Sequence, residues 1–228
     1  MNANNNINNI GYGISNEKII FQNRILRNTY LLLSFSLSLC FITSFFTVFF
    51  NLQMPILLLF FMYFGLSFLI EKYNDSYIGL CLTVIFTLVM GMFIGQIVIN
   101  YMHMFTNALD IIFISGILTT TIFLSLSGYA LFTKKNFSFL KGFLVIMSVV
   151  ILFSIIVSFF VNDLFFHFMI SGAIILFSSA GILYKTSSMV LNGDQQSYIS
   201  ISLSLFLDII NIFLSLIRIL SIFMGRRD

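Results

Sequence analysis

Seven apolar segments constrain this 228-residue chain more than any other feature, because each is close to the ~20 residues with which an α-helix crosses a bilayer. The segments span roughly 29–50, 54–70, 77–100, 108–132, 140–161, 164–189 and 197–223. In lipid, every backbone polar group must be satisfied within the protein, and these segments lack the period-two alternation of barrel strands. The sequence therefore predicts an all-α, polytopic membrane helix bundle with seven transmembrane helices.

The composition excludes several other classes of protein. Hydrophobic residues make up 59% and charged residues 8% of the chain, and the mean hydropathy is +1.05, which is too apolar for a soluble domain. The formal net charge of +3 is modest and its bases lie at segment ends, so we expect no nucleic-acid partner. Protease, hydrolase and phosphate-binding motifs are absent from the sequence, as is a pair of carboxylates in one pocket. We therefore expect no enzyme activity, no catalytic residue, no metal site and no cofactor.

The N-terminal region has a different composition from the rest. Residues 1–23, beginning "MNANNNINNIGYGISNEK", are polar and rich in Asn, with no apolar core segment of a signal peptide. The sequence predicts a disordered cytoplasmic tail over 1–23, followed by a seven-helix transmembrane domain over 24–228.

The orientation follows from the basic residues, which concentrate in cytoplasmic loops. Eight of them fall on one side when seven helices are threaded in order: Lys18, Arg24, Arg27, Lys72, Lys134, Lys135, Lys141 and Lys185. The connections on the opposite side carry no Lys or Arg, so we expect a cytoplasmic N-terminus. Seven crossings would place Arg226 and Arg227 outside, against this rule, whereas a re-entrant last segment would bring them inside. Both topologies stay open at this point.

The last apolar segment contains polar residues that share one helical face. At 100° per residue, a stripe of roughly 80° holds five of them: Ser204, Asp208, Asn211, Ser215 and Arg218. A charge facing lipid at mid-depth costs at least a few kcal/mol. The stripe should therefore face the bundle interior or a wet cavity, which makes the last helix the central one.

Asp208 and Arg218 need separate partners, because ten residues of helix separate them by about 15 Å. Lys185, on the preceding segment, is the best candidate for Asp208. A simple hairpin leaves an offset of roughly 10 Å between the two residues, which a Lys side chain covers only in part. Three readings of Asp208 remain: a structural buried polar residue, a pH-sensitive latch and a permeation site.

Several stretches of the chain resemble one known family. They are "RNTYLLLSFSLSL" (27–39), "SFLKGFL" (138–144), "ILYKTSSMVLNGDQQSYISISLSLFLDIINIFLSLIRIL" (182–220) and the terminal "RD". They resemble the Bax inhibitor-1 family of seven-helix membrane proteins. The greatest likeness is to the bacterial branch that modulates the membrane protease FtsH.

The resemblance implies specific roles for residues of the last two helices. In calcium-leak members of the family, two aspartates on helices six and seven share a proton and gate a pore. Asp208 matches the second aspartate, whereas Lys185 stands at the position of the first, so the two-acid dyad is absent. A base on helix two pairs with the first aspartate in those members. This chain instead has Glu71 adjacent to Lys72, which suggests an exchanged pair of Glu71 with Lys185.

Two classes of function follow from these observations. The first is a multi-pass protein of the bacterial inner membrane that modulates the FtsH protease complex and membrane-protein quality control. The second is a pH-sensitive calcium or cation leak along the stripe of the last helix. The tail and Lys185 favour the first, and the intramembrane Asp208 keeps the second open. In either case we expect an intramembrane polar network of six residues: Asp208, Lys185, Glu71, Asn211, Ser215 and Arg218.

Overall fold

Seven α-helices make up the fold in the computed structural model, which describes residues 2–74, 76–158, 160–161, 163–192 and 197–225. The helices are α1 (Asn2–Phe49), α2 (Ile56–Lys72), α3 (Tyr77–Met104), α4 (Ala108–Thr133), α5 (Leu140–Ser158), α6 (Leu164–Asn192) and α7 (Tyr198–Met224). Each coincides with one of the seven apolar segments to within a few residues, apart from the N-terminal part of α1. The predicted all-α bundle is confirmed.

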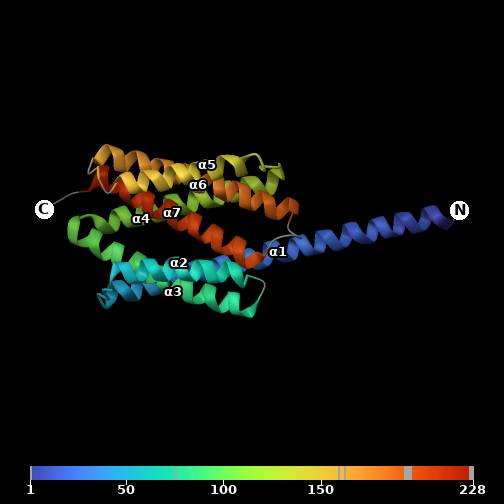
Figure 1. Cartoon of the computed structure of the whole chain (residues 1–228), viewed down its shortest axis with the longest axis horizontal. Helices are drawn as coiled ribbons and strands as arrows, with labels where there is room; N and C mark the ends of the chain where they lie inside the picture. The colour runs from blue at the N-terminus through green and yellow to red at the C-terminus, as the bar shows by residue number, and fades with distance from the viewer. Residues whose placement is uncertain (1, 75, 159, 162, 193–196, 226–228) are drawn as a thin grey trace.

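The helices lie roughly along one direction, with α7 in the middle of the bundle (Figure 1). In that view α2 and α3 lie on one side of α7, and α5 and α6 lie on the other. Helix α7 contacts α1, α3, α4 and α6, and more of its residues are buried than in any other candidate span. The prediction of a central last helix is therefore confirmed.

Six of the described helices are long and apolar enough to cross a membrane. The remaining helix, α2, has 17 residues, at the lower limit of what a span requires. Pro55 occupies the N-cap of α2, where a missing backbone N–H removes no helical hydrogen bond. The predicted segment 54–70 begins within two residues of this start, which is consistent with the low tolerance of a helix interior for proline.

The start of α1 differs from the expectation of a disordered tail. The structure continues α1 back to Asn2, so that its N-terminal part projects away from the bundle (Figure 1). The apolar part of this helix, suited to a membrane, begins at Asn23. Most helical stability in proteins comes from tertiary packing, which a projecting helical segment lacks. The domain boundary between residues 23 and 24 stays a prediction.

Close contact between α1 and α3 depends on two glycines. A Cβ added at Gly91 would lie 2.7 Å from the carbonyl oxygen of Cys40, and one at Gly95 would lie 2.6 Å from Cβ of Thr47. No larger side chain fits there without moving α1. The Gly91 and Gly95 pair is thus a small-xxx-small packing face of the kind common in membrane helices.

The start of α1 and the end of α7 lie at opposite ends of the molecule (Figure 1), as an odd number of crossings requires. Helix α7 is continuous over 27 residues, which is long enough for a full crossing. Arg226, Arg227 and the terminal "RD" lie outside the described residues, and the cytoplasmic N-terminus stays a prediction.

Candidate functional site

An ion pair joins the last two helices in the middle of the bundle. The Nζ atom of Lys185 on α6 lies 2.7 Å from Oδ2 of Asp208 on α7, and it also donates to the carbonyl oxygen of Ser204 at 3.1 Å. The side chain of Asp208 is 5% exposed and that of Lys185 is 26% exposed. Asp208 thus has the partner that the sequence favoured.

The direction of helical side chains explains how Lys185 spans the expected offset. Side chains lean toward the N-terminus of their own helix, and α6 and α7 are antiparallel neighbours. Lys185 therefore leans away from the α6–α7 connection, whereas Asp208 leans toward it. The two side chains approach each other and close the gap of roughly 10 Å that the simple hairpin predicted between their positions.

Gly181 makes room for the carboxylate on the facing helix. A Cβ at this position would lie 2.8 Å from Oδ2 of Asp208 and 3.2 Å from its Cγ. Gly181 is one turn before Lys185, so the carboxylate sits against bare backbone while the ammonium reaches it from the next turn. Even a methyl group at position 181 would push Asp208 away from α6.

A cavity of about 280 Å³ opens beside this ion pair. Residues of α5, α6 and α7 line it, and they include Lys141, Ser148, Tyr184, Lys185 and Asp208. Lys141 is exposed and adds a second positive charge near the single carboxylate. Calcium prefers several oxygen ligands, with carboxylates among them, whereas this cavity combines one carboxylate with two ammonium groups.

Glu71 does not join this ion pair in the described structure. Its Oε2 atom accepts a hydrogen bond of 3.0 Å from the Oγ atom of Ser200, near the start of α7, and Glu71 is exposed. The suggested exchanged pair of Glu71 with Lys185 is not formed, because Lys185 instead reaches toward mid-membrane to Asp208. Glu71 thus helps to hold the end of α2 against the start of α7.

The polar stripe of α7 faces more than one environment. Asp208 and Ser215 are buried, whereas Asn211 and Arg218 are exposed. The stripe was expected to face the bundle interior or a wet cavity, and both occur: Asp208 and Ser215 are buried, whereas Asn211 and Arg218 line cavities. A stripe of roughly 80° is wide enough to touch α6 along one edge and an open groove along the other.

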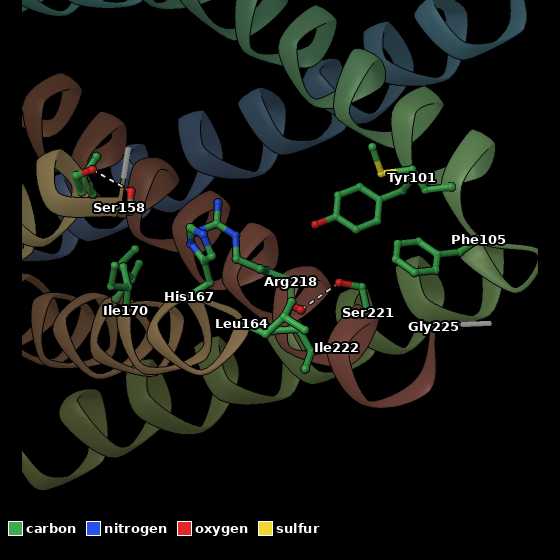
Figure 2. Close-up of a pocket in the computed structure, with 13 residues that line it drawn as sticks. Tyr101, Phe105, Ser158, Leu164, His167, Ile170, Arg218, Ser221, Ile222 and Gly225 are labelled. Carbon is green, nitrogen blue, oxygen red and sulfur yellow. Dashed lines mark hydrogen bonds between the residues drawn. The ribbon is translucent and has the colours of Figure 1, made fainter. Parts of the chain in front are cut away.

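Arg218 lies in a separate pocket at the end of the bundle where α7 terminates (Figure 2). This pocket, called the Arg218 pocket below, has a volume of about 730 Å³ and is lined by residues of α3, α5, α6 and α7 together with Phe105 and Gly225. Its polar side chains include Arg218, His167, Tyr101 and Ser158. The predicted six-residue network therefore does not form one unit. Asp208 and Lys185 make the central pair, Glu71 contacts Ser200, and Arg218 lines this pocket. Asn211 lines a different cavity and Ser215 is buried.

Sequence reasoning missed two contributors to these sites. Gly181 has no sequence pattern that marks it, because its role depends on the residue that faces it from α7. His167 and Arg218 are 51 positions apart in the sequence, and only the antiparallel packing of α6 and α7 brings them to one pocket. The position of Arg218 within an apolar segment was the one signal available for this pocket.

The chain is similar over most of its length to one protein family and to several bacterial proteins. Residues 22–225 match the model of the family described as "Inhibitor of apoptosis-promoting Bax1". The chain is 34% identical over 204 residues to "Modulator of FtsH protease YccA" of Escherichia coli K12, which covers 89% of this chain and 91% of that protein. It is 34% identical over 209 residues to a membrane protein of Vibrio cholerae, covering 90% and 92% of the two chains. A Pseudomonas aeruginosa protein is 35% identical over 199 residues, covering 87% and 89%.

The matched region begins just before the apolar part of α1 and ends after α7, so it includes every helix of the bundle. It also contains both members of the central ion pair and the Arg218 pocket. This helical membrane protein belongs to the Bax inhibitor-1 family.

Proposed function

We propose that this protein modulates the FtsH protease in the inner membrane of a bacterium and thereby takes part in membrane-protein quality control. The observation that carries the proposal is the 34% identity to the E. coli modulator of FtsH over 89% of this chain. The proposed role is one of binding without catalysis, and its partners are the lipid bilayer and the FtsH complex.

Two features of the structure support such a role. The N-terminal part of α1 projects beyond the bundle (Figure 1), where a protease that pulls on its substrates could hold it. The bundle that follows is tied together by the buried Lys185–Asp208 pair and by the close approach of α1 to α3 at Gly91 and Gly95. A protease that binds the projecting segment but extracts the bundle from the membrane only slowly would remain occupied by this protein.

Deletion of residues 2–20 tests this proposal. The shortened protein should still insert into the membrane, because the apolar segments are intact, but it should lose most of its effect on the degradation of FtsH substrates. The measurement is the half-life of a membrane substrate of FtsH in cells that express each variant. A variant with residues 2–20 in scrambled order is the matched control, and it should keep the effect because the length of the segment is unchanged.

Two outcomes would contradict the proposal. One is an unchanged substrate half-life and an unchanged turnover of the shortened protein. The other is a full-length protein that inserts but has no effect on any FtsH substrate.

The calcium or cation leak is not favoured as a function. Asp208 is held by the ammonium of Lys185 at 2.7 Å, and the positive charge repels a divalent cation from the position where the family's calcium-leak members carry an acid. Calcium flux into proteoliposomes, measured over a range of pH, tests this reasoning. We expect no flux above that of protein-free vesicles, and a pH-dependent flux that Asp208→Asn abolishes would reinstate the leak.

A further inference from the structure

The guanidinium of Arg218 has no partner in the part of the chain that the structure describes. It makes no ion pair and no hydrogen bond there, although Arg218 lies within α7, a candidate membrane span. Ionisable residues within such segments are rare, and each is a candidate functional site by default. The Arg218 pocket therefore presents a positive charge that a bound anion could neutralise.

The other polar groups of the pocket also suit an anion. His167 and Arg218 both line it, and the side chain of Arg218 extends toward the imidazole ring of His167 (Figure 2). Tyr101 also lines the pocket, whereas the Ser158 hydroxyl donates to the carbonyl oxygen of Ile155 at 2.6 Å. None of the described residues that line the pocket is acidic. The nearby Asp163 caps α6, where its Oδ2 atom accepts a 3.3 Å hydrogen bond from the N–H of Phe166.

The pocket lies at the depth of lipid head groups. Arg218 is six residues before Met224, the last residue of α7, so about 9 Å of helix separates it from that end. A long arginine side chain at this depth reaches the interface between hydrocarbon and water. A phosphate carried by a lipid would meet the guanidinium there.

A second, apolar cavity adjoins the Arg218 pocket at Ile155. Ile155 lines both the Arg218 pocket and this second cavity of about 420 Å³ between α2, α3, α5 and α7. The second cavity is lined by apolar side chains such as Met90 and Leu214, with Asn211 among them. Asn211 and Arg218 are two helical turns apart and thus on the same face of α7, about 10 Å from each other along the axis. The second cavity, called the groove below, therefore lies where an extended apolar chain that starts at Arg218 could enter it.

We propose that the Arg218 pocket binds the phosphate of an anionic membrane phospholipid, with an acyl chain of that lipid lying in the groove toward Asn211. Arg218 donates two parallel hydrogen bonds to the phosphate, which is the geometry in which guanidinium binds phosphate most strongly. The imidazole of His167 donates a further hydrogen bond. The apolar groove selects a lipid over free phosphate, because free phosphate would leave the groove unfilled.

Titration of phosphatidylglycerol into the purified full-length protein tests this inference. The protein is held in a zwitterionic detergent, and native mass spectrometry and the melting temperature report binding, with phosphatidylcholine as the uncharged comparison. We expect phosphatidylglycerol to bind more tightly and to raise the melting temperature. Arg218→Gln should weaken its binding roughly tenfold, as expected for the loss of a charge-assisted hydrogen bond, and Arg218→Lys should weaken it less.

Lys72→Gln is the matched control, because Lys72 is an exposed base at the end of α2, outside the pocket. It should leave the affinity for phosphatidylglycerol unchanged. Equal losses in Lys72→Gln and Arg218→Gln would show general surface attraction and overturn the proposal. So would an affinity for phosphatidylglycerol in Arg218→Gln that equals that of the wild type.

Two further probes separate the lipid from other occupants. Inorganic phosphate and glycerophosphoglycerol carry the anion without acyl chains, and both should bind at least tenfold more weakly than phosphatidylglycerol. Equal binding of either would make the pocket a free-anion site and overturn the lipid assignment. A changed oligomeric state of Arg218→Gln with unchanged lipid affinity would instead assign the groove to a second copy of the chain.

Discussion

The two charged positions of α7 differ in how the protein compensates them. Asp208, at mid-membrane, is buried against α6 and paired with Lys185 at 2.7 Å. Arg218, about 15 Å further along the same helix, is exposed in a pocket of about 730 Å³ and has no described protein partner. The comparison shows that one stripe of a helix can serve two purposes. The buried charge stabilises the bundle, and the open charge is available to a ligand.

The largest expected effect comes from breaking the central pair. Asp208→Leu leaves the ammonium of Lys185 partly buried without a counter-ion, which typically costs about 3–5 kcal/mol. Replacing both partners, as in Asp208→Leu with Lys185→Met, can be nearly neutral. Unfolding of the purified protein by denaturant in mild detergent measures both free energies. Equal and negligible effects of the single and double changes would show that the pair contributes nothing to stability.

A smaller effect is expected at the glycine that admits the carboxylate. Gly181→Ala places a Cβ 2.8 Å from Oδ2 of Asp208, and overpacking of this kind costs roughly 1–3 kcal/mol. Gly172→Ala, on the same helix, is the matched control because a Cβ there meets no atom within 4 Å. The same unfolding measurement should separate the two variants. If Gly172→Ala destabilises the protein as much as Gly181→Ala, the cost belongs to α6 in general and not to the ion pair.

The smallest effect on stability is expected at Arg218. Arg218→Leu removes an exposed side chain without a described protein partner, and such changes usually alter the free energy of unfolding by no more than about 0.5 kcal/mol. Unfolding in detergent free of anionic lipid measures this. A loss as large as that of Asp208→Leu would mean that Arg218 holds the bundle together, and the distinction between the two positions would disappear.

The pairing of Lys185 with Asp208 shows how much of the site could be predicted from the sequence. The pairing with Asp208 could be predicted because few charges lie at similar depths on adjacent helices. Its geometry could not, since the simple hairpin ignores the opposite lean of side chains on antiparallel helices. Glu71 was placed with Lys185 on the strength of a family pattern, whereas the structure pairs it with Ser200.

The sequence by itself determined the seven helices, their approximate ends, the membrane setting and the family. These properties depend on local hydropathy, on the length of helix that a bilayer requires and on stretches of residues that can be recognised one by one. Tertiary structure decided which edge of the α7 stripe is buried, that Gly181 admits the carboxylate of Asp208, and that His167 and Arg218 share a pocket. Each of these depends on the rotation and relative height of two packed helices, and the pattern of a single segment leaves both unspecified.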